Sequence, residues 1–103
     1  MREGRRRYGL AFLGKRAVGA IGYKTRAGRL VFGPLGVLPQ YRGRGVGAAL
    51  VRWMEERAKE ANCRRLQAQV LRGLSSLVRF YERLGYRTVK NRKGQTIAVK
   101  RLR

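Results

Sequence analysis

The sequence predicts a single α/β domain over residues 1–103, with a sheet of mixed strand direction and the element order βββ-α-β-α-ββ. The chain has 103 residues, which is the size of one domain. Hydrophobic residues make up 44% of it, a share typical of a folded protein, so disorder is not expected. Apolar residues alternate in six short segments and recur at helical spacing in two longer ones, which predicts strands and helices respectively.

The first three elements are predicted strands of an antiparallel meander. They cover Tyr8–Leu13, Ala17–Tyr23 and Arg29–Val37, and short glycine-containing turns connect them. Because proline has no N–H to donate, Pro34 predicts a bulge or an edge within the third strand.

A long amphipathic helix follows the third strand. Its predicted apolar face carries Val46, Ala49, Leu50, Trp53, Met54, Ala58 and Ala61. On its polar face, Glu55 and Lys59 have the i, i+4 spacing of a favourable ion pair. Trp53 is interpreted as a core residue.

Arg65–Leu71 alternates as a strand and is reached through a helix, so we expect it to lie parallel to the third strand. The segments Tyr86–Lys90 and Gln95–Lys100 predict a terminal hairpin.

A second helix is predicted to end at Leu84. Ser75 or Ser76 is positioned to cap its N-terminus. Gly85 follows at the position where a left-handed residue ends a helix.

The charge balance excludes several classes of protein. Lys and Arg number 26 against 5 Asp and Glu, so the formal net charge is +21; His and Asp are absent and Cys63 is the single cysteine. Zinc fingers, Ser-His-Asp or Cys-His catalysis and an internal disulfide are therefore excluded, and no metal site is predicted. No apolar run has the length of a membrane span, the N-terminus lacks a signal-peptide core, and the lone cysteine favours a cytoplasmic location.

The positive charge indicates either a polyanionic partner, such as nucleic acid or an acidic protein, or a generic basic surface. Both interpretations stay open, because the basic residues are spread along the chain. Short clusters occur only at Arg5–Arg7 and Arg64–Arg65.

One segment carries a chemical signal. Between Val37 and Ala48 the sequence reads VLPQYRGRGVGA, so a strand ends, a glycine-rich turn follows and the long helix begins. Such a turn exposes unpaired N–H groups at a helix N-terminus and favours phosphate. It is neither a Walker A loop nor a dinucleotide fingerprint. The alternative is a tight turn with incidental glycines.

The pattern Arg42-x-x-Gly45-x-Gly47, preceded by Val37-x-Pro39, resembles the acetyl-CoA pyrophosphate loop of the GNAT superfamily of N-acetyltransferases. The stretch from Phe80 to Tyr86, FYERLGY, is similar to a second signature of that family. The resemblance covers about Tyr8 to Lys100, and it implies the GNAT sheet fold and acetyl-CoA as cofactor.

The resemblance also implies roles for individual residues. The acetyl carbonyl and the pantetheine arm would contact the end of the third strand, at Leu35, Gly36 and Val37. The pyrophosphate would be bound by Arg42, Gly43, Arg44, Gly45, Val46, Gly47 and Ala48. The strands ending at Val37 and starting near Leu66 would splay around the cofactor. Tyr81 would be the general acid for the leaving thiolate, the alternative being a core aromatic.

The chain departs from the family pattern in three ways. The strand and two helices that usually precede the first hairpin are lacking, so the acceptor side should be open or completed by a second subunit, as in a homodimer. Leu74 stands where many relatives have a cofactor-binding Asn. The strand Arg29–Val37 has no glutamate to act as general base.

These features predict an acetyl-CoA-dependent N-acetyltransferase acting on an amine of an acidic or nucleic-acid-associated acceptor. The alternative is a catalytically inactive module of the same fold that binds nucleic acid or another polyanion through its basic surface.

Overall fold

The computed structural model describes residues 6–102. Its elements are β1 (Arg7–Leu13), β2 (Arg16–Arg26), β3 (Arg29–Val37), α1 (Val46–Glu60), β4 (Arg65–Gln69), α2 (Ser75–Arg83), β5 (Arg87–Lys90) and β6 (Thr96–Arg101), with short 3₁₀ turns at Pro39–Tyr41 and Leu71–Gly73. The predicted order of strands and helices is confirmed. No helix among these residues has both the length and the apolar character needed to cross a membrane.

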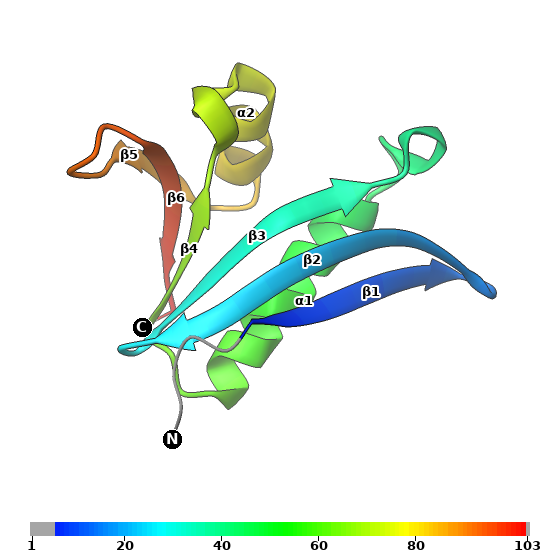
Figure 1. The fold of residues 1–103 in the computed structure, drawn as a ribbon, viewed down its shortest axis with the longest axis horizontal. Coiled ribbons are helices and arrows are strands. Elements are labelled where there is room, and N and C mark those ends of the chain that lie inside the picture. The colour runs from blue at the N-terminus through cyan, green and yellow to red at the C-terminus, as the bar shows by residue number, and fades with distance from the viewer. Residues whose placement is uncertain (1–5, 103) are drawn as a thin grey trace.

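The strands form a six-stranded sheet in the order β1-β2-β3-β4-β6-β5. Strands β3 and β4 run parallel, as predicted, and the other neighbours run antiparallel. The pairing of β3 with β4 ends where Phe32 lies opposite Ala68. Beyond that pair the two strands diverge, and Figure 1 shows the resulting opening between β3 and β4.

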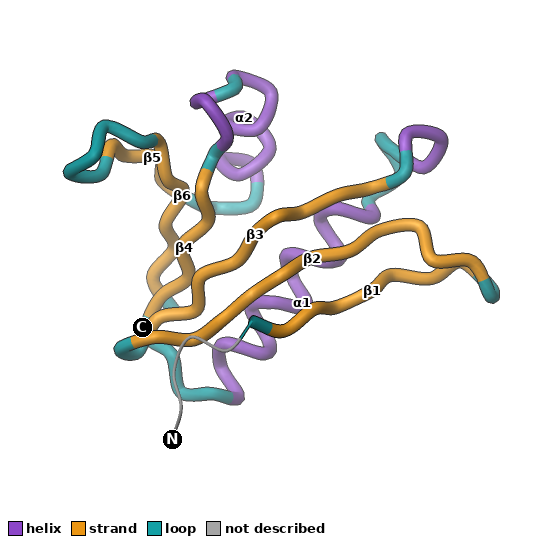
Figure 2. Tube along the Cα trace, viewed as in Figure 1, coloured by secondary structure: helices purple, strands orange, loops and turns teal. Residues whose placement is uncertain are grey.

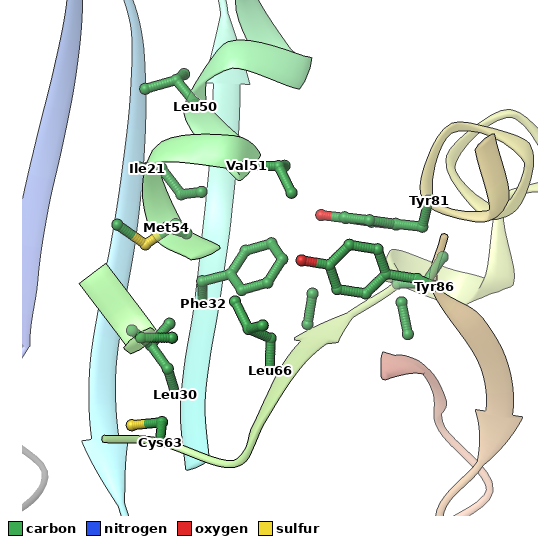
Figure 3. Close-up of a cluster of buried hydrophobic side chains, with 14 residues drawn as sticks. Ile21, Leu30, Phe32, Leu50, Val51, Met54, Cys63, Leu66, Tyr81 and Tyr86 are labelled. Carbon is green, nitrogen blue, oxygen red and sulfur yellow. The ribbon is translucent and has the colours of Figure 1, made fainter. Parts of the chain in front are cut away.

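Both helices contribute to one core on one face of the sheet. Helix α1 crosses behind β1, β2 and β3 in Figure 2, and its side chains Leu50, Val51 and Met54 are buried there. Figure 3 shows Tyr81 from α2 extending into the same core, toward Phe32. No helix among residues 6–102 covers the opposite face of the sheet.

Gly9 permits the close approach of α1 to β1, because a methyl group at this position would overlap the Trp53 ring. The ring packs edge-on against Tyr23 with a centroid distance of 5.8 Å, and the Arg57 guanidinium lies over it. Trp53 is nevertheless 36% exposed, so it lies at the rim of the core.

Two local predictions are confirmed. The register between β2 and β3 shifts opposite Pro34, which is the predicted bulge. Gly85 has a left-handed φ of +91°, and the Tyr86 N–H donates to the Tyr81 carbonyl, which closes the end of α2.

Two other local predictions are wrong. Neither Ser75 nor Ser76 caps α2; Leu74 occupies the N-cap position and no side chain bonds to the free amides. The serines lie one step too far along the chain, inside the first turn. Strand β4 ends at Gln69 rather than Leu71, because the chain turns through a left-handed Arg72.

Candidate functional site

The opening between β3 and β4 is the centre of the candidate site. From Gly33 to Val37, the backbone edge of β3 that faces away from β2 has no strand partner among the described residues. The loop into α1 continues from the end of this strand, and α2 borders the opening near its closed end (Figure 1). The predicted splaying of the two strands is therefore present.

The loop between β3 and α1 presents free backbone amides. Gly43 and Gly45 have left-handed φ values of +77° and +84°, and nothing lies within 4 Å of the space a side chain would take. The first helical bond runs from the Ala49 N–H to the Gly45 carbonyl. The amides of the first turn, Val46, Gly47 and Ala48, have no carbonyl partner in the described chain. We call residues 43–48 the glycine loop; free amides at a helix N-terminus are groups to which an anion can bind.

Gly47 has a different role from the other two glycines. A Cβ on this residue would lie 3.3 Å from the Phe80 ring of α2. Its lack of a side chain therefore lets the first turn of α1 pack against α2. This contact joins the two helices at the site.

Two arginines border the glycine loop, and both are exposed. The Nε of Arg42 donates to the Val37 carbonyl at 3.1 Å, which ties the loop to the end of β3. The Arg44 guanidinium stacks over the Tyr41 ring at 5.6 Å from its centroid. Stacking orders the side chain while its N–H groups remain available to an anion.

The end of β3 contributes to both faces of the sheet. Leu35 is half-buried and packs against the core, whereas Gly36 is exposed on the opposite face. On that face an apolar hollow of about 360 Å³ is lined by Leu10, Ala20, Gly36, Leu38 and neighbouring residues. The strand end therefore lies between the core and an open apolar surface.

The ring of Tyr81 is part of the core, but its hydroxyl is not hydrogen-bonded to any described residue. The side chain is only 4% exposed, and its ring contacts Phe32, Phe80 and Tyr86 edge-on with centroid distances of 5.1–5.9 Å. Its hydroxyl has no hydrogen-bond partner among residues 6–102. Figure 3 shows this hydroxyl directed toward Val51 of α1. Burial raises the pKa of Tyr81 to about 12, so the phenol stays protonated at neutral pH.

A polar cluster beside Tyr81 was not predicted. The Tyr86 hydroxyl donates to Glu55 Oε2 at 2.9 Å, and Lys100 Nζ bonds to the same oxygen at 3.1 Å and to the Leu84 carbonyl at 3.0 Å. Burial, followed by the Glu55 carboxylate, raises the pKa of Tyr86. The predicted pair of Glu55 with Lys59 is wrong, because this carboxylate points inward between two partners.

No local sequence signal identifies this cluster, since its three residues lie on three different elements. Lys59 instead pairs with Glu56 on the exposed helix surface, at 3.4 Å.

No strand of the described chain carries a carboxylate. The four glutamates at 55, 56, 60 and 82 lie on the two helices. Leu74, at the N-cap of α2, is 47% exposed and offers no polar side chain. The site therefore presents backbone amides, guanidinium groups and one phenol, and no obvious base at the strand end.

Comparison with known proteins identifies relatives with this architecture. The model of the acetyltransferase (GNAT) family matches residues 1–86. The PaiA N-acetyltransferase of Thermoplasma acidophilum, solved in complex with coenzyme A, superposes with a TM-score of 0.83 at 22% identity, over 93% of this chain and 60% of that one. A GNAT acetyltransferase of Staphylococcus aureus gives 0.82 at 19% identity, over 95% and 68%.

An acetyltransferase of Thermus thermophilus is more similar in sequence. It shares 32% identity and a TM-score of 0.79, over 95% of this chain and 65% of that one. The chain thus spans less than two thirds of the length of the Thermoplasma and Thermus proteins. Because the family model covers most of the sequence and the fold agrees, the chain belongs to the acetyltransferase (GNAT) family.

Proposed function

We propose that this chain is an acetyl-CoA-dependent N-acetyltransferase. The observation that carries the proposal is the row of free amides in the glycine loop, at the mouth of an opening whose closed end holds the unpaired hydroxyl of Tyr81. The structural relative from Thermoplasma acidophilum was solved in complex with coenzyme A, which supports the choice of cofactor.

The residues present fit coenzyme A in their donor set. Free amides and the dipole of α1 suit a pyrophosphate, and Arg42 and Arg44 add positive charge beside it. The unpaired backbone edge of β3 from Gly33 to Val37 offers N–H and C=O groups to the amides of a pantetheine arm. We assign these groups to cofactor binding, together with Leu35 and Gly36 at the strand end.

Acetyl-CoA supplies an acetyl thioester that an amine attacks. In this chain the Tyr81 hydroxyl holds a proton for the thiolate that leaves, and its raised pKa keeps that proton in place at neutral pH. The amide N–H near Val37 is a donor for the oxygen that gains negative charge. With no carboxylate on the strands, the amine arrives neutral or passes its proton to water.

The charge of the protein selects against some acceptors. A net charge of +21 repels cationic polyamines and aminoglycosides. We therefore propose an acceptor amine on an acidic protein segment or on a molecule associated with nucleic acid. The apolar hollow beside Gly36 opens on the face from which such an amine would approach.

Calorimetric titration with acetyl-CoA at about 0.3 M salt, where surface attraction is largely screened, tests the proposal. We expect binding that persists at this salt concentration and exceeds the binding of ATP, the polyphosphate control. Equal binding of both ligands, or loss of binding with salt, would contradict the cofactor assignment.

The alternative is a non-catalytic module that retains the cofactor fold and binds a polyanion. The absence of a carboxylate from the strands favours it. Acetyl-CoA binding without turnover of any amine in a panel of acidic peptides and nucleic-acid-linked amines would support this alternative; turnover that Tyr81→Phe abolishes would exclude it.

A further inference from the structure

Four arginines lie side by side on four adjacent strands. In the sheet register, Arg26 of β2 is opposite Arg29 of β3, which is opposite Arg65 of β4, which is opposite Arg101 of β6. Directly opposed residues share a face of the sheet. The next residues, Leu30 and Leu66, are fully buried in the core. The four arginines, here called the arginine row, therefore stand on the face that neither helix covers.

A second row on the same face extends the positive surface. In register across β2, β3, β4, β6 and β5 it reads Lys24, Val31, Gln67, Val99 and Arg87. Lys24 and Arg87 thus flank a neutral centre. The two rows together hold six cations, and no strand in the described residues carries an Asp or Glu that could balance them.

Such an arrangement is unfavourable in the free protein, since like charges directly opposite each other destabilise a sheet. The salt bridges of the described chain lie elsewhere, on α1 and between Glu55 and Lys100. The Nε of Arg29 is buried and has no hydrogen-bond partner. Among residues 6–102, no salt bridge therefore involves the row.

The backbone around the row is held in place. The Arg64 N–H donates to the Gly28 carbonyl at 2.7 Å, and the Leu102 N–H donates to the Arg64 carbonyl at 2.8 Å. These bonds join the β2–β3 turn, the start of β4 and the end of β6, which meet at the lower left of Figure 1. An open hollow of about 660 Å³ at this corner is lined by Arg64, Arg65, Arg101 and the turn residues Ala27 and Gly28.

We infer that the arginine row binds the phosphate backbone of a nucleic-acid duplex. Three spacings between neighbouring strands give the row a length of about 14 Å. A duplex presents one charge per roughly 1.7 Å of its axis, so that length faces about eight phosphates. Arginine forks match phosphate oxygens with two parallel hydrogen bonds.

The chemistry of the second row favours a duplex over a single strand. Its uncharged members are Val31, Gln67 and Val99, and none offers an aromatic ring on which a base stacks. The exposed Tyr8 ring on the same face lies on β1, outside both rows. Single-strand binding depends on such stacking, whereas backbone contact to a duplex needs only the charges. The binding is therefore independent of base sequence.

This inference goes beyond the proposed acetyl transfer and does not depend on it. Strand β3 begins at Arg29, in the row, and ends at Val37, beside the glycine loop. The strand is nine residues long, counting both of these positions, so they lie about 26 Å apart. Loss of nucleic-acid binding and loss of acetyl-CoA binding are therefore separate outcomes, and each is measured on the same sample.

The test measures the affinity of the full chain for fluorescent duplexes of about 20 base pairs, RNA and DNA, between about 50 and 200 mM salt. One variant replaces the row by glutamine (Arg26→Gln, Arg29→Gln, Arg65→Gln, Arg101→Gln). The matched control removes the same number of charges from exposed arginines elsewhere (Arg52→Gln, Arg79→Gln, Arg83→Gln, Arg92→Gln). Polyglutamate of similar charge is the competing probe, and thermal melting checks that both variants fold.

We expect the row variant to bind the duplex at least about tenfold more weakly at 0.1 M salt. The slope of the logarithm of the binding constant against the logarithm of the salt concentration should become shallower by roughly 3 to 4. The control variant should keep most of the duplex affinity and most of its salt dependence. If both variants lost the same duplex affinity, the row would contribute no more than any other exposed arginines, and the inference would be overturned. Tighter binding of polyglutamate than of the duplex would instead assign the face to an acidic protein and would also overturn it. If the row variant does not fold, the single variant Arg65→Gln carries the test, with an expected loss of about 1 unit of slope.

Discussion

The two ends of β3 carry the two surfaces proposed to bind anions, and these surfaces are made in different ways. At its C-terminal end, the glycine loop offers the backbone amides of the first turn of α1, those of Val46, Gly47 and Ala48. At its N-terminal end, the arginine row offers side chains from four strands. The first surface is local in the sequence, and the second exists only after the sheet has formed.

Backbone amides and guanidinium groups differ in the range and in the salt dependence of their attraction to anions. Amides at a helix N-terminus are fixed dipoles that act over a few ångströms, so they recognise shape and are screened little. Guanidinium groups are full charges that act through solvent, so their contribution depends strongly on salt. A change at one end of β3 should therefore leave ligand binding at the other end unaffected.

The largest contrast should come from salt. Raising salt from about 50 to 200 mM should weaken duplex binding by about 100-fold or more, because four to six phosphate contacts release counterions. Acetyl-CoA affinity should fall only a few-fold over the same range. Parallel titrations of one preparation measure both. Equal slopes for the two ligands would remove the distinction between the surfaces.

Tyr81→Phe should lower kcat by about 100-fold and leave the affinity for acetyl-CoA unchanged, since only the proton donor is removed. Because the hydroxyl has no hydrogen-bond partner, the free energy of unfolding should change little. Tyr86→Phe is the matched control: it removes the hydrogen bond to Glu55, so stability should fall by about 1 to 3 kcal/mol. Full activity of Tyr81→Phe would rule out its role as the acid.

Gly45→Ala should weaken acetyl-CoA binding by about tenfold, because a left-handed alanine costs roughly 1 to 2 kcal/mol and shifts the loop amides. Gly94→Ala is the control, since Gly94 has a similar φ of +77° and open space but lies in the β5–β6 turn. Duplex binding should be unchanged in both variants. A loss of acetyl-CoA affinity in Gly94→Ala as large as in Gly45→Ala would mean that strain anywhere in the fold disturbs the site.

The smallest expected effect is on stability at alkaline pH. The pKa of Tyr81 is about 12 in the folded protein and about 10 when unfolded, and that of Tyr86 is raised as well. A group with a raised folded pKa stabilises the fold fully below pH 10 and loses that contribution as the pH rises toward 12. The free energy of unfolding should therefore fall over this window.

Tyr81→Phe should make this decline shallower. Urea denaturation at pH 8 and pH 10.5 measures it in both proteins. An unchanged decline in the variant would show that Tyr81 does not contribute.

The features that were predicted correctly are short in sequence. The glycine-rich turn before α1, the bulge at Pro34 and the left-handed Gly85 each depend on a few neighbouring residues and on backbone geometry. The strands and helices follow from the spacing of apolar residues. Their order, with the resemblance of two motifs, is enough to predict the sheet class.

Two of the predictions that were wrong concern which residue caps α2 and which residue pairs with Glu55. Ser75 has the right chemistry for a cap, but Leu74 occupies the N-cap position and Ser75 is the first residue of the helix. Glu55 has the right spacing for Lys59, but two partners from the other side of the core reach it instead. A partly buried carboxylate gains more from two such hydrogen bonds than from one exposed ion pair. Spacing within a helix cannot reveal a competitor that the fold supplies.

The sequence by itself determined the order of elements, the position of the glycine loop and the excess of positive charge. Only the tertiary structure decided where that charge gathers. Arg26, Arg29, Arg65 and Arg101 become neighbours because Leu30 and Leu66 enter the core side by side and set the register of β3 against β4, and because β6 inserts between β4 and β5. Register is a property of paired strands, so no single segment of the chain contains it.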